Sequence, residues 1–309
     1  MTTKVCINGV IQDESAAVIP VTDRGFLYGD SVYEVVRTYG GEPFALAEHL
    51  ERLQQSASRL GMSLFEPPAK PGAAPRADGL EPIIRDIHDT LASAGHVESY
   101  VRVIITRGSG PFGLDPGLAD HPRRVVIVAP LQPLPAAYYD AGVPVHLVPT
   151  GRAGGHTLLA GAKSGNYLVN VLALGLARGQ GAHEAVLLDH DDRVTEGASS
   201  NLFMVAGGQV LTPPLSAGIL EGITRHKVCG LAAEAGFPVT ERAIPCRDLR
   251  QADEIFLTST LREILPVQRL DDQTVGDGRP GPITRRLLAD YRAAVVGSEV
   301  APRGQEHGQ

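Results

Sequence analysis

Cysteine is scarce in this sequence. Only Cys6, Cys229 and Cys246 occur among 309 residues, and no two of them form a C-x-x-C pair. Disulfide scaffolds need many paired cysteines, and structural zinc sites need closely spaced ones, so we expect neither. We therefore expect no bound metal, and the reducing cytoplasm is the expected location.

Long apolar runs and an excess of positive charge are also missing. No stretch approaches the roughly 20 apolar residues of a membrane-spanning helix, and the first residues, MTTKVCI, contain no apolar core of a secretion signal. Lys and Arg total 28 against 35 Asp and Glu, a formal net charge of −7. A broad nucleic-acid-binding surface is therefore not expected, and neither is a membrane partner.

What remains is an ordinary globular composition, with 43% apolar and 20% charged residues. The length suits two domains or one large one. Glycine (35 residues) and proline (23 residues) divide the chain into short elements. Strand and helix patterns are mixed without strict alternation, which favours an α+β fold over a doubly wound sheet.

In the first half, the Asn8-Gly9 pair predicts a hairpin between 4 and 12, because both residues tolerate the left-handed backbone of a tight turn. Apolar residues at helical spacing predict a helix from Leu46 to Leu60, stopped by Gly61. A Pro/Ala/Gly-rich loop is expected at 66–79. The other expected elements are strands at 31–39, 99–107 and 123–130 and a helix at 81–94.

The second half is predicted to contain the strands 144–149, 184–189, 201–206, 209–212, 237–243, 254–259 and 264–270 and the helices 167–179, 223–235 and 281–296. The proline-rich segment 131–142 interrupts the pattern and is expected to link two domains. We thus predict an N-terminal domain at 1–130, a linker at 131–142, a C-terminal domain at 143–296 and a disordered tail at 297–309.

Two charged residues stand in small-residue surroundings. Lys163 lies in AGAKSGNY, where an approachable amine can form a Schiff base; a surface lysine at a helix start is the alternative. Glu196 lies in RVTEGASS, where a buried carboxylate can keep a cofactor ring nitrogen protonated. A turn carboxylate that accepts backbone N–H groups is its alternative.

Three further patterns suit anion binding. Arg52 in EHLERL offers a guanidinium for phosphate, or else it lies on a solvated helix face. The helix that opens with Gly222-Ile223-Thr224 has an N-terminus that favours anions, although many plain caps look alike. The Thr258-Ser259-Thr260 cluster follows a strand and is either a binding turn or an ordinary polar turn.

The joint order of these patterns is the informative feature. The stretches DRGFLYGDSVYEVVR, HLERLQQSA, EGASSNLF, LTPPLSAGILEGITR and ADEIFLTST resemble class IV aminotransferases, the pyridoxal-phosphate enzymes of fold type IV. The resemblance covers nearly the whole chain and implies the two-domain α+β fold of D-amino-acid aminotransferases. This family includes branched-chain aminotransferases, D-amino-acid transaminases and aminodeoxychorismate lyases.

The resemblance implies roles for individual residues. Lys163 becomes the catalytic residue, which bonds to pyridoxal phosphate and later moves a proton. By the same resemblance, Arg52 binds the phosphate of the cofactor, Glu196 pairs with its pyridine nitrogen and Tyr167 contacts its phenolic oxygen. The remaining cofactor-binding positions are Ser199, Ser200, Ile223, Thr224 and Thr260.

Tyr28, Tyr33 and Arg37 match the part of the pattern that lines the substrate pocket. Arg102 is a further candidate for a substrate carboxylate, because an unpaired charge among apolar neighbours is costly. Leu261 and Arg262 occupy the turn where branched-chain enzymes have two alanines, and Arg262 adds a charge there.

In the loop 109–117, Phe112 and Leu114 stand where D-amino-acid transaminases carry an Arg-x-His pair. The carboxylate trap of that subgroup is therefore absent. Branched-chain enzymes also have one more residue between the lysine and the Asn-Tyr pair than KSGNY provides.

These features favour a transaminase that moves an amino group from a branched-chain-like or broad aliphatic amino acid to a 2-oxo acid. A D-amino-acid or (R)-amine transaminase is one alternative, and a 4-amino-4-deoxychorismate lyase is another, suggested by the TRGSG stretch at 106–110. A non-catalytic relative that keeps the fold is opposed by the joint presence of Lys163, Glu196 and Arg52. The resemblance further implies a homodimer.

Overall fold

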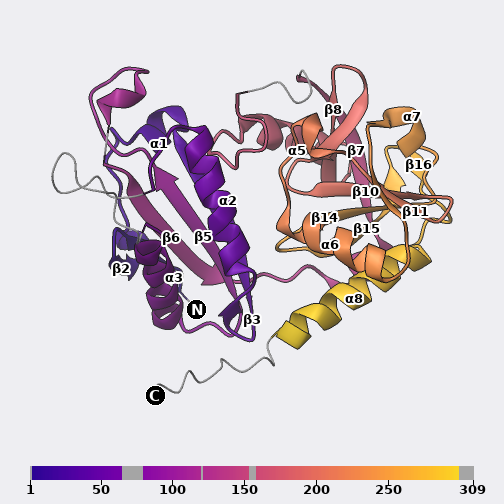
Figure 1. The fold of residues 1–309 in the computed structure, drawn as a ribbon, viewed down its shortest axis with the longest axis horizontal. Helices are drawn as coiled ribbons and strands as arrows, with labels where there is room; N and C mark the ends of the chain where they lie inside the picture. The colour runs from indigo at the N-terminus through magenta and orange to yellow at the C-terminus, as the bar shows by residue number, and fades with distance from the viewer. Residues whose placement is uncertain (1, 65–78, 120, 153–157, 299–309) are drawn as a thin grey trace, which may run out of the picture.

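Two β-sheets lie side by side, one in each half of the chain (Figure 1). The predicted α+β fold is confirmed. No helix in the described part of the chain is long and apolar enough to cross a membrane. The predicted loop 66–79 and tail 297–309 lie almost entirely outside that part. The computed structural model describes residues 2–64, 79–119, 121–152 and 158–298.

The first sheet has six antiparallel strands in the order β2-β1-β6-β5-β3-β4. Helices α2 and α3 cover one face, where alternate residues of β5 such as Val101, Val103 and Ile105 are buried. The elements of this half are β1 (Lys4–Ile7), β2 (Val10–Asp13), α1 (Arg24–Tyr28), β3 (Ser31–Tyr39), β4 (Glu42–Pro43), α2 (Leu46–Arg59), α3 (Glu81–Ala94), β5 (Ser99–Thr106) and β6 (Arg123–Pro130).

The predicted hairpin is confirmed. Asn8 and Gly9 have positive φ angles of 49° and 87°, as the tight turn between β1 and β2 requires. The predicted strand 31–39 and the helices 46–60 and 81–94 are also present within one residue. Helix α1 was not predicted; it is one short turn whose N-terminus is capped by the side chain of Asp23.

The second sheet has ten strands in the order β12-β11-β10-β14-β15-β7-β8-β9-β13, with β16 paired to β15, and it curls into a half-barrel. Strands β7 and β8 run parallel, which their connection through α5 allows. The elements are β7 (Val143–Arg152), α5 (Leu168–Gly179), β8 (Glu184–Asp189), β9 (Arg193–Gly197), β10 (Asn201–Ala206), β11 (Gln209–Thr212), α6 (Ile223–Glu234), β12 (Val239–Glu241), β13 (Ile244–Pro245), α7 (Cys246–Leu249), β14 (Glu254–Ser259), β15 (Glu263–Leu270), β16 (Gln273–Thr274) and α8 (Pro282–Ser298).

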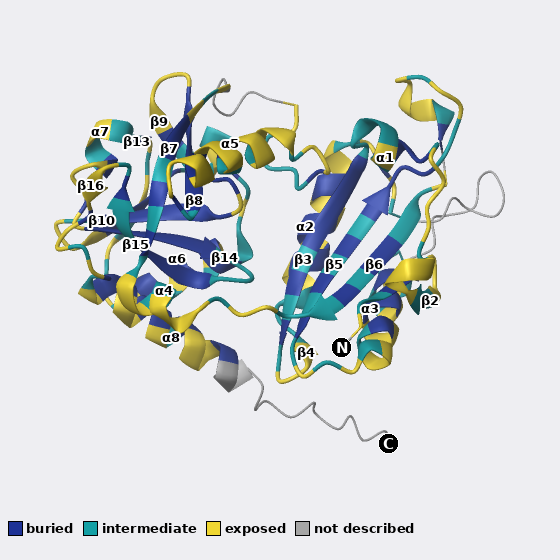
Figure 2. Ribbon diagram, turned by 180° about the vertical axis from the view of Figure 1, so that it is seen from behind, coloured by how far each residue is buried: buried dark blue, intermediate teal, exposed yellow. Residues whose placement is uncertain are grey.

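Both faces of this second sheet are buried, as the dark strands in Figure 2 show. On β10, Leu202 and Met204 belong to the core inside the curled sheet, whereas Phe203 and Val205 pack under α6 and α8. A strand buried on both faces carries a continuous apolar run, and NLFMV at 201–205 is such a run.

The predicted linker 131–142 runs from the first sheet to the second and contains a short helix, α4 (Ala136–Ala141). The domain boundaries that we placed at this segment stay a prediction. Strand β9 was not predicted from the sequence, and Glu196 lies within this strand, next to the turn that follows it. Strand β3, the last long strand of the first sheet, is the element of that sheet that faces the second half.

Candidate active site

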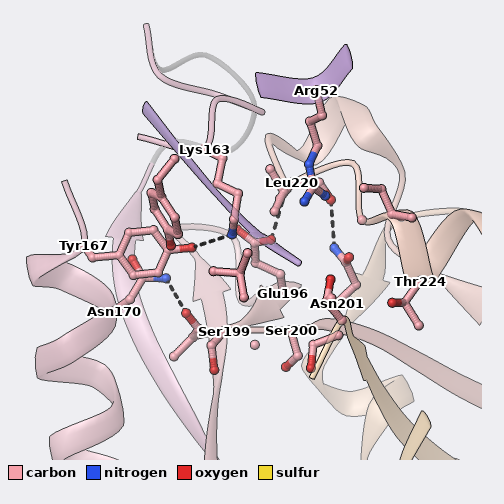
Figure 3. Close-up of a pocket in the computed structure, with 18 of the residues that line it drawn as sticks. Arg52, Lys163, Tyr167, Asn170, Glu196, Ser199, Ser200, Asn201, Leu220 and Thr224 are labelled. Atoms are coloured by element: carbon pink, nitrogen blue, oxygen red, sulfur yellow. Dashed lines mark hydrogen bonds between the residues drawn. The ribbon is translucent and has the colours of Figure 1, made fainter. Parts of the chain in front are cut away.

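A cavity of about 1000 Å³ lies between the two halves. Figure 3 shows the amine of Lys163 near its centre, with Arg52 above and Thr224 to one side. The structure brings most of the predicted site residues to its walls. They are Tyr33, Arg52, Arg102, Lys163, Tyr167, Glu196, Ser199, Ser200, Ile223, Thr224, Thr260, Leu261 and Arg262.

The amine of Lys163 is enclosed by aromatic rings. Its Nζ lies 4.5 Å from the centre of the Tyr33 ring and donates a hydrogen bond of 3.4 Å to the hydroxyl of Tyr167. The two tyrosine rings meet edge to face, with centroids 5.4 Å apart. Burial, followed by the neighbouring Tyr167, raises the pKa of Tyr33, so its hydroxyl stays protonated.

The backbone around Lys163 is bound to the first half of the chain. The N–H of Tyr33 on β3 donates to the carbonyl of Lys163 (2.9 Å), and the N–H of Gly165 donates to the carbonyl of Ser31 (2.9 Å). On the other side, the N–H of Lys163 donates to Oγ of Ser56 on α2 (3.0 Å). The lysine thus extends the free edge of β3, although it follows the second sheet's first strand in sequence.

The guanidinium of Arg52 is oriented by a buried carboxylate. Nε and Nη2 donate to the two oxygens of Glu34 at 2.7 and 2.8 Å, and His49 Nδ1 lies 2.7 Å from the same carboxylate. Nη1 donates to the carbonyl of Glu221 (2.8 Å), the second residue before α6. An arginine carries five N–H donors, so these three contacts leave two, one on each terminal nitrogen.

The N-terminus of α6 lies beside this guanidinium. Gly222 is its N-cap and no side chain caps the first turn, so the amides of Ile223 and Thr224 have no side-chain acceptor. A β-carbon at Gly222 would lie 1.9 Å from Oδ1 of Asn201, which explains why glycine occupies this position. A helix N-terminus and a guanidinium that meet in one cavity form a binding site for an anion.

Glu196 reaches the cavity from β9. Its Oε2 accepts the N–H of Leu220 (3.0 Å), whose carbonyl accepts from the side-chain amide of Asn201 (2.9 Å). Two hydroxyl oxygens on the same wall, Ser200 Oγ and Thr258 Oγ1, are buried and have no hydrogen-bond partner among the described residues. Because such groups are normally satisfied, they point to a polar ligand in the cavity.

Arg102 lines the cavity from β5 of the first sheet. Its guanidinium stacks 4.0 Å from the ring centre of Tyr33, and Nη1 donates a long hydrogen bond of 3.5 Å to Tyr100. Within the described residues, Arg102 forms no ion pair with a carboxylate, whereas Arg52 pairs with Glu34 and Arg262 pairs with Glu184.

Two predicted substrate residues do not line the cavity of this chain. Arg37 pairs with Glu263 (3.4 Å) and stacks on Tyr39. The hydroxyl of Tyr28 accepts the N–H of Gly113 in the neighbouring loop. In that loop Phe112 and Leu114, which stand at the expected Arg-x-His positions, are 77% and 79% exposed, and neither lines the cavity of one chain.

Sequence reasoning missed Glu34 and Ser56, which hold Arg52 and Lys163 in place. Ser56 follows Arg52 by four residues, so helical spacing already put both on one face of α2. Glu34 stands in an apolar strand next to Tyr33, and a lone charge there is a signal that a buried partner exists.

The chain is similar to known proteins along nearly its full length. The family model described as amino-transferase class IV matches residues 31–270. A Methanocaldococcus jannaschii protein, provisionally named a branched-chain-amino-acid aminotransferase, is 37% identical over 94% of this chain and 95% of its own length. The D-alanine aminotransferase of Bacillus licheniformis is 34% identical over 96% of this chain and 99% of its own.

The solved structures agree. A branched-chain amino acid aminotransferase of Escherichia coli superimposes with a TM-score of 0.86 at 29% identity, and the match covers 100% of this chain and 98% of that one. A second branched-chain amino acid aminotransferase, from T.th. and solved with pyridoxamine 5'-phosphate, has a TM-score of 0.86 at 30% identity. That match covers 96% of this chain and 95% of the other.

Proposed function

The chain belongs to the class IV aminotransferases, which depend on pyridoxal phosphate, and we propose that it transfers the amino group of a branched-chain or broad aliphatic amino acid to a 2-oxo acid. The observation that carries the proposal is the meeting of Lys163, Glu196, Arg52 and the α6 N-terminus in one cavity. Each of these groups has another explanation alone, but together they match the needs of a phosphorylated pyridine aldehyde.

The residues present fit this cofactor. The two N–H groups that Glu34 and Glu221 leave on Arg52 point to an anion, as do the uncapped amides at the start of α6. The buried, unpartnered hydroxyls of Ser200 and Thr258 offer further polar contacts within the same cavity of the described chain. We assign the phosphate to Arg52, the α6 amides and the Thr260 turn, and the ring to Glu196 and Tyr167.

When bound, pyridoxal phosphate acts as an electron sink that weakens a bond to the substrate's Cα. The chain's own groups then have defined tasks. Nζ of Lys163, which lies between the Tyr33 ring and the Tyr167 hydroxyl, would accept the proton from the substrate's Cα and deliver it to the C4′ carbon of the cofactor. Glu196, which lines the cavity, would hold a proton on the nitrogen of the cofactor ring.

Arg102 supports an amino acid as the donor. Of the guanidinium groups in the cavity, it is the one without a carboxylate partner in the described ranges, which leaves its N–H groups for a substrate carboxylate. Tyr33, Val35 and Leu134 also line the cavity, and their apolar surfaces suit an aliphatic side chain.

A D-amino acid is the second candidate donor. The similarity to a D-alanine aminotransferase, at 34% identity, supports it, whereas the exposed Phe112 and Leu114 stand where that subgroup is expected to hold the carboxylate. The handedness of the donor depends on which wall takes the carboxylate, so both enantiomers belong in the test.

The experiment is a spectral half-reaction of the cofactor-loaded enzyme with L-leucine, D-alanine and (R)-1-phenylethylamine. We expect L-leucine to convert the cofactor to its amine form fastest, and a lack of conversion by all three donors would contradict the transaminase. Arg102→Met should lower kcat/KM for the amino acid by about a hundredfold, because a charged hydrogen-bond donor is lost. The amine, which has no carboxylate, should be unaffected.

We further propose that two copies of the chain form a homodimer in the cytoplasm. Helix α5 supports the pairing, because four apolar side chains on it are 60–69% exposed; the helix is drawn largely in yellow, the colour of exposed residues, in Figure 2. A second copy would remove this surface from water. The four residues are Leu168, Val171, Leu172 and Leu176.

A further inference from the structure

Arg262 reaches the cavity wall, but nearly all its hydrogen-bonding capacity is used within the protein. Nη1 donates to Glu184 (2.7 Å), Nη2 donates to both the carbonyl and the hydroxyl of Ser199 (2.8 Å each), and Nε donates to the hydroxyl of Ser259 (3.1 Å). Four of its five N–H donors are therefore occupied. The guanidinium has no pair of parallel N–H groups left to hold a substrate carboxylate.

The partner of Arg262 is a fully buried carboxylate. Glu184 is the first residue of β8; its Oε2 also accepts the hydroxyl of Ser199 (2.8 Å), and its Oε1 accepts the N–H of Ala185 (3.1 Å). A buried carboxylate is tolerated only when it is paired and hydrogen-bonded. Glu184 therefore keeps Arg262 at this place, whatever occupies the cavity.

Together the three side chains join two turns that line the cavity. One is the turn 197–200 between β9 and β10, which adjoins Glu196 and contains Ser200. The other is the turn 259–262 between β14 and β15, which contains Thr260. The Glu184–Arg262–Ser199 cluster thus sets the distance between the two sides of the cofactor cradle.

We propose that Arg262 is a positioning residue for the cofactor cradle, acting through Glu184 and Ser199, and not a receptor for the substrate carboxylate. The inference rests on the proposed function, since it assigns the cradle to pyridoxal phosphate. The proposal differs from the expectation drawn from the sequence, which placed Arg262 among the substrate-binding residues, and it assigns substrate recognition to Arg102.

The test distinguishes the positive charge of Arg262 from the arrangement of its N–H groups. Arg262→Lys keeps a cation beside Glu184 but loses the fork of N–H groups that reaches Ser199 and Ser259. We expect this variant, prepared without cofactor, to melt near the wild-type temperature, and its dissociation constant for pyridoxal phosphate to rise about tenfold. Arg247→Lys, at an arginine whose side chain is 85% exposed, is the matched control and should bind the cofactor normally.

A second measurement tests whether Arg262 binds the carboxylate of the substrate. With the cofactor at saturation, the affinity for 4-methylvalerate, an aliphatic carboxylate without an amine, should be the same in the Arg262→Lys variant as in the wild type. Unchanged cofactor affinity would overturn the inference, as would a tenfold loss of 4-methylvalerate binding with normal cofactor affinity.

Two controls keep the outcomes separate. If Arg262→Lys does not fold, Ser199→Ala removes the other end of the cluster, and the same rise in the cofactor's dissociation constant is expected. If the wild-type enzyme does not bind 4-methylvalerate, the aliphatic donor class fails, while the cofactor affinity of the lysine variant still decides the role of Arg262.

Discussion

Replacing Glu34 by glutamine should destabilise the protein and weaken the binding of the cofactor phosphate by Arg52. The carboxylate is fully buried and receives two N–H groups of Arg52, at 2.7 and 2.8 Å, and lies 2.7 Å from Nδ1 of His49. Glutamine has nearly the same shape but no charge, and its amide nitrogen would face a donor. The substitution therefore leaves a guanidinium without its buried counter-charge.

Two routes give the size of the effect. Burial tends to raise the pKa of Glu34, but Arg52 and His49 outweigh it and hold the pKa at about 2, against an ordinary value of 4.5. Since each pKa unit corresponds to about 1.4 kcal/mol, this difference represents about 3 kcal/mol at neutral pH. Removing one partner of a buried ion pair costs about 3–5 kcal/mol. We therefore expect a loss of about 3 kcal/mol.

The pH dependence follows from the sign of this shift. The folded state lowers the pKa of Glu34, so its contribution is complete above about pH 4.5 and is lost as the pH falls toward 2. Burial lowers the pKa of His49, so its stabilising contribution as a neutral ring is lost as the pH falls below 6.5. In the Glu34→Gln variant, the loss of stability between pH 4.5 and 2 should be much shallower than in the wild type.

Urea unfolding of the cofactor-free protein measures this contribution. The matched control is Glu51→Gln, an exposed glutamate on α2, the helix that carries Arg52, and it should be neutral within about 0.5 kcal/mol. The Glu34 variant should also bind pyridoxal phosphate about tenfold more weakly, because Arg52 is no longer oriented. Wild-type stability with an unchanged pH profile would refute the reasoning.

Three other substitutions test separate parts of the site. Lys163→Ala should abolish the absorbance of the lysine-bound cofactor and lower transamination by at least about a thousandfold in a coupled assay; normal absorbance would contradict the assignment. Gly222→Ala should cost about 1–3 kcal/mol in urea unfolding, because its β-carbon would overlap Asn201, and a neutral result would argue against this close approach. Leu172→Glu should convert the proposed dimer to a monomer in sedimentation velocity, and an unchanged sedimentation coefficient would exclude α5 from the interface.

Elements with strong local signals were predictable from the sequence. Asn8-Gly9 gave the hairpin and the apolar spacing of Leu46 to Leu60 gave α2, because both are determined by backbone preferences and by a single buried face. Strand β9 and helix α1 were missed. Both have five residues, and such short elements depend on the strands and loops they contact more than on their own composition.

The candidate site was also predictable from the sequence only in part. The order of Arg52, Lys163 and Glu196 in the sequence pointed to a pyridoxal-phosphate enzyme before any contact was known. The attachment of Lys163 to β3 and α2 was not visible, because its partners Tyr33 and Ser56 lie more than a hundred residues earlier in the chain.

The sequence by itself determined the family and the cofactor, and it proposed the few polar residues that would bind it. Only the tertiary structure decided which arginine is left without a carboxylate partner among the described residues. Arg37 meets Glu263 and Arg262 meets Glu184, whereas Arg102 meets no carboxylate in the described part of the chain. The reason is physical: whether a guanidinium is paired depends on carboxylates that folding brings from distant segments, and residue spacing does not record those contacts.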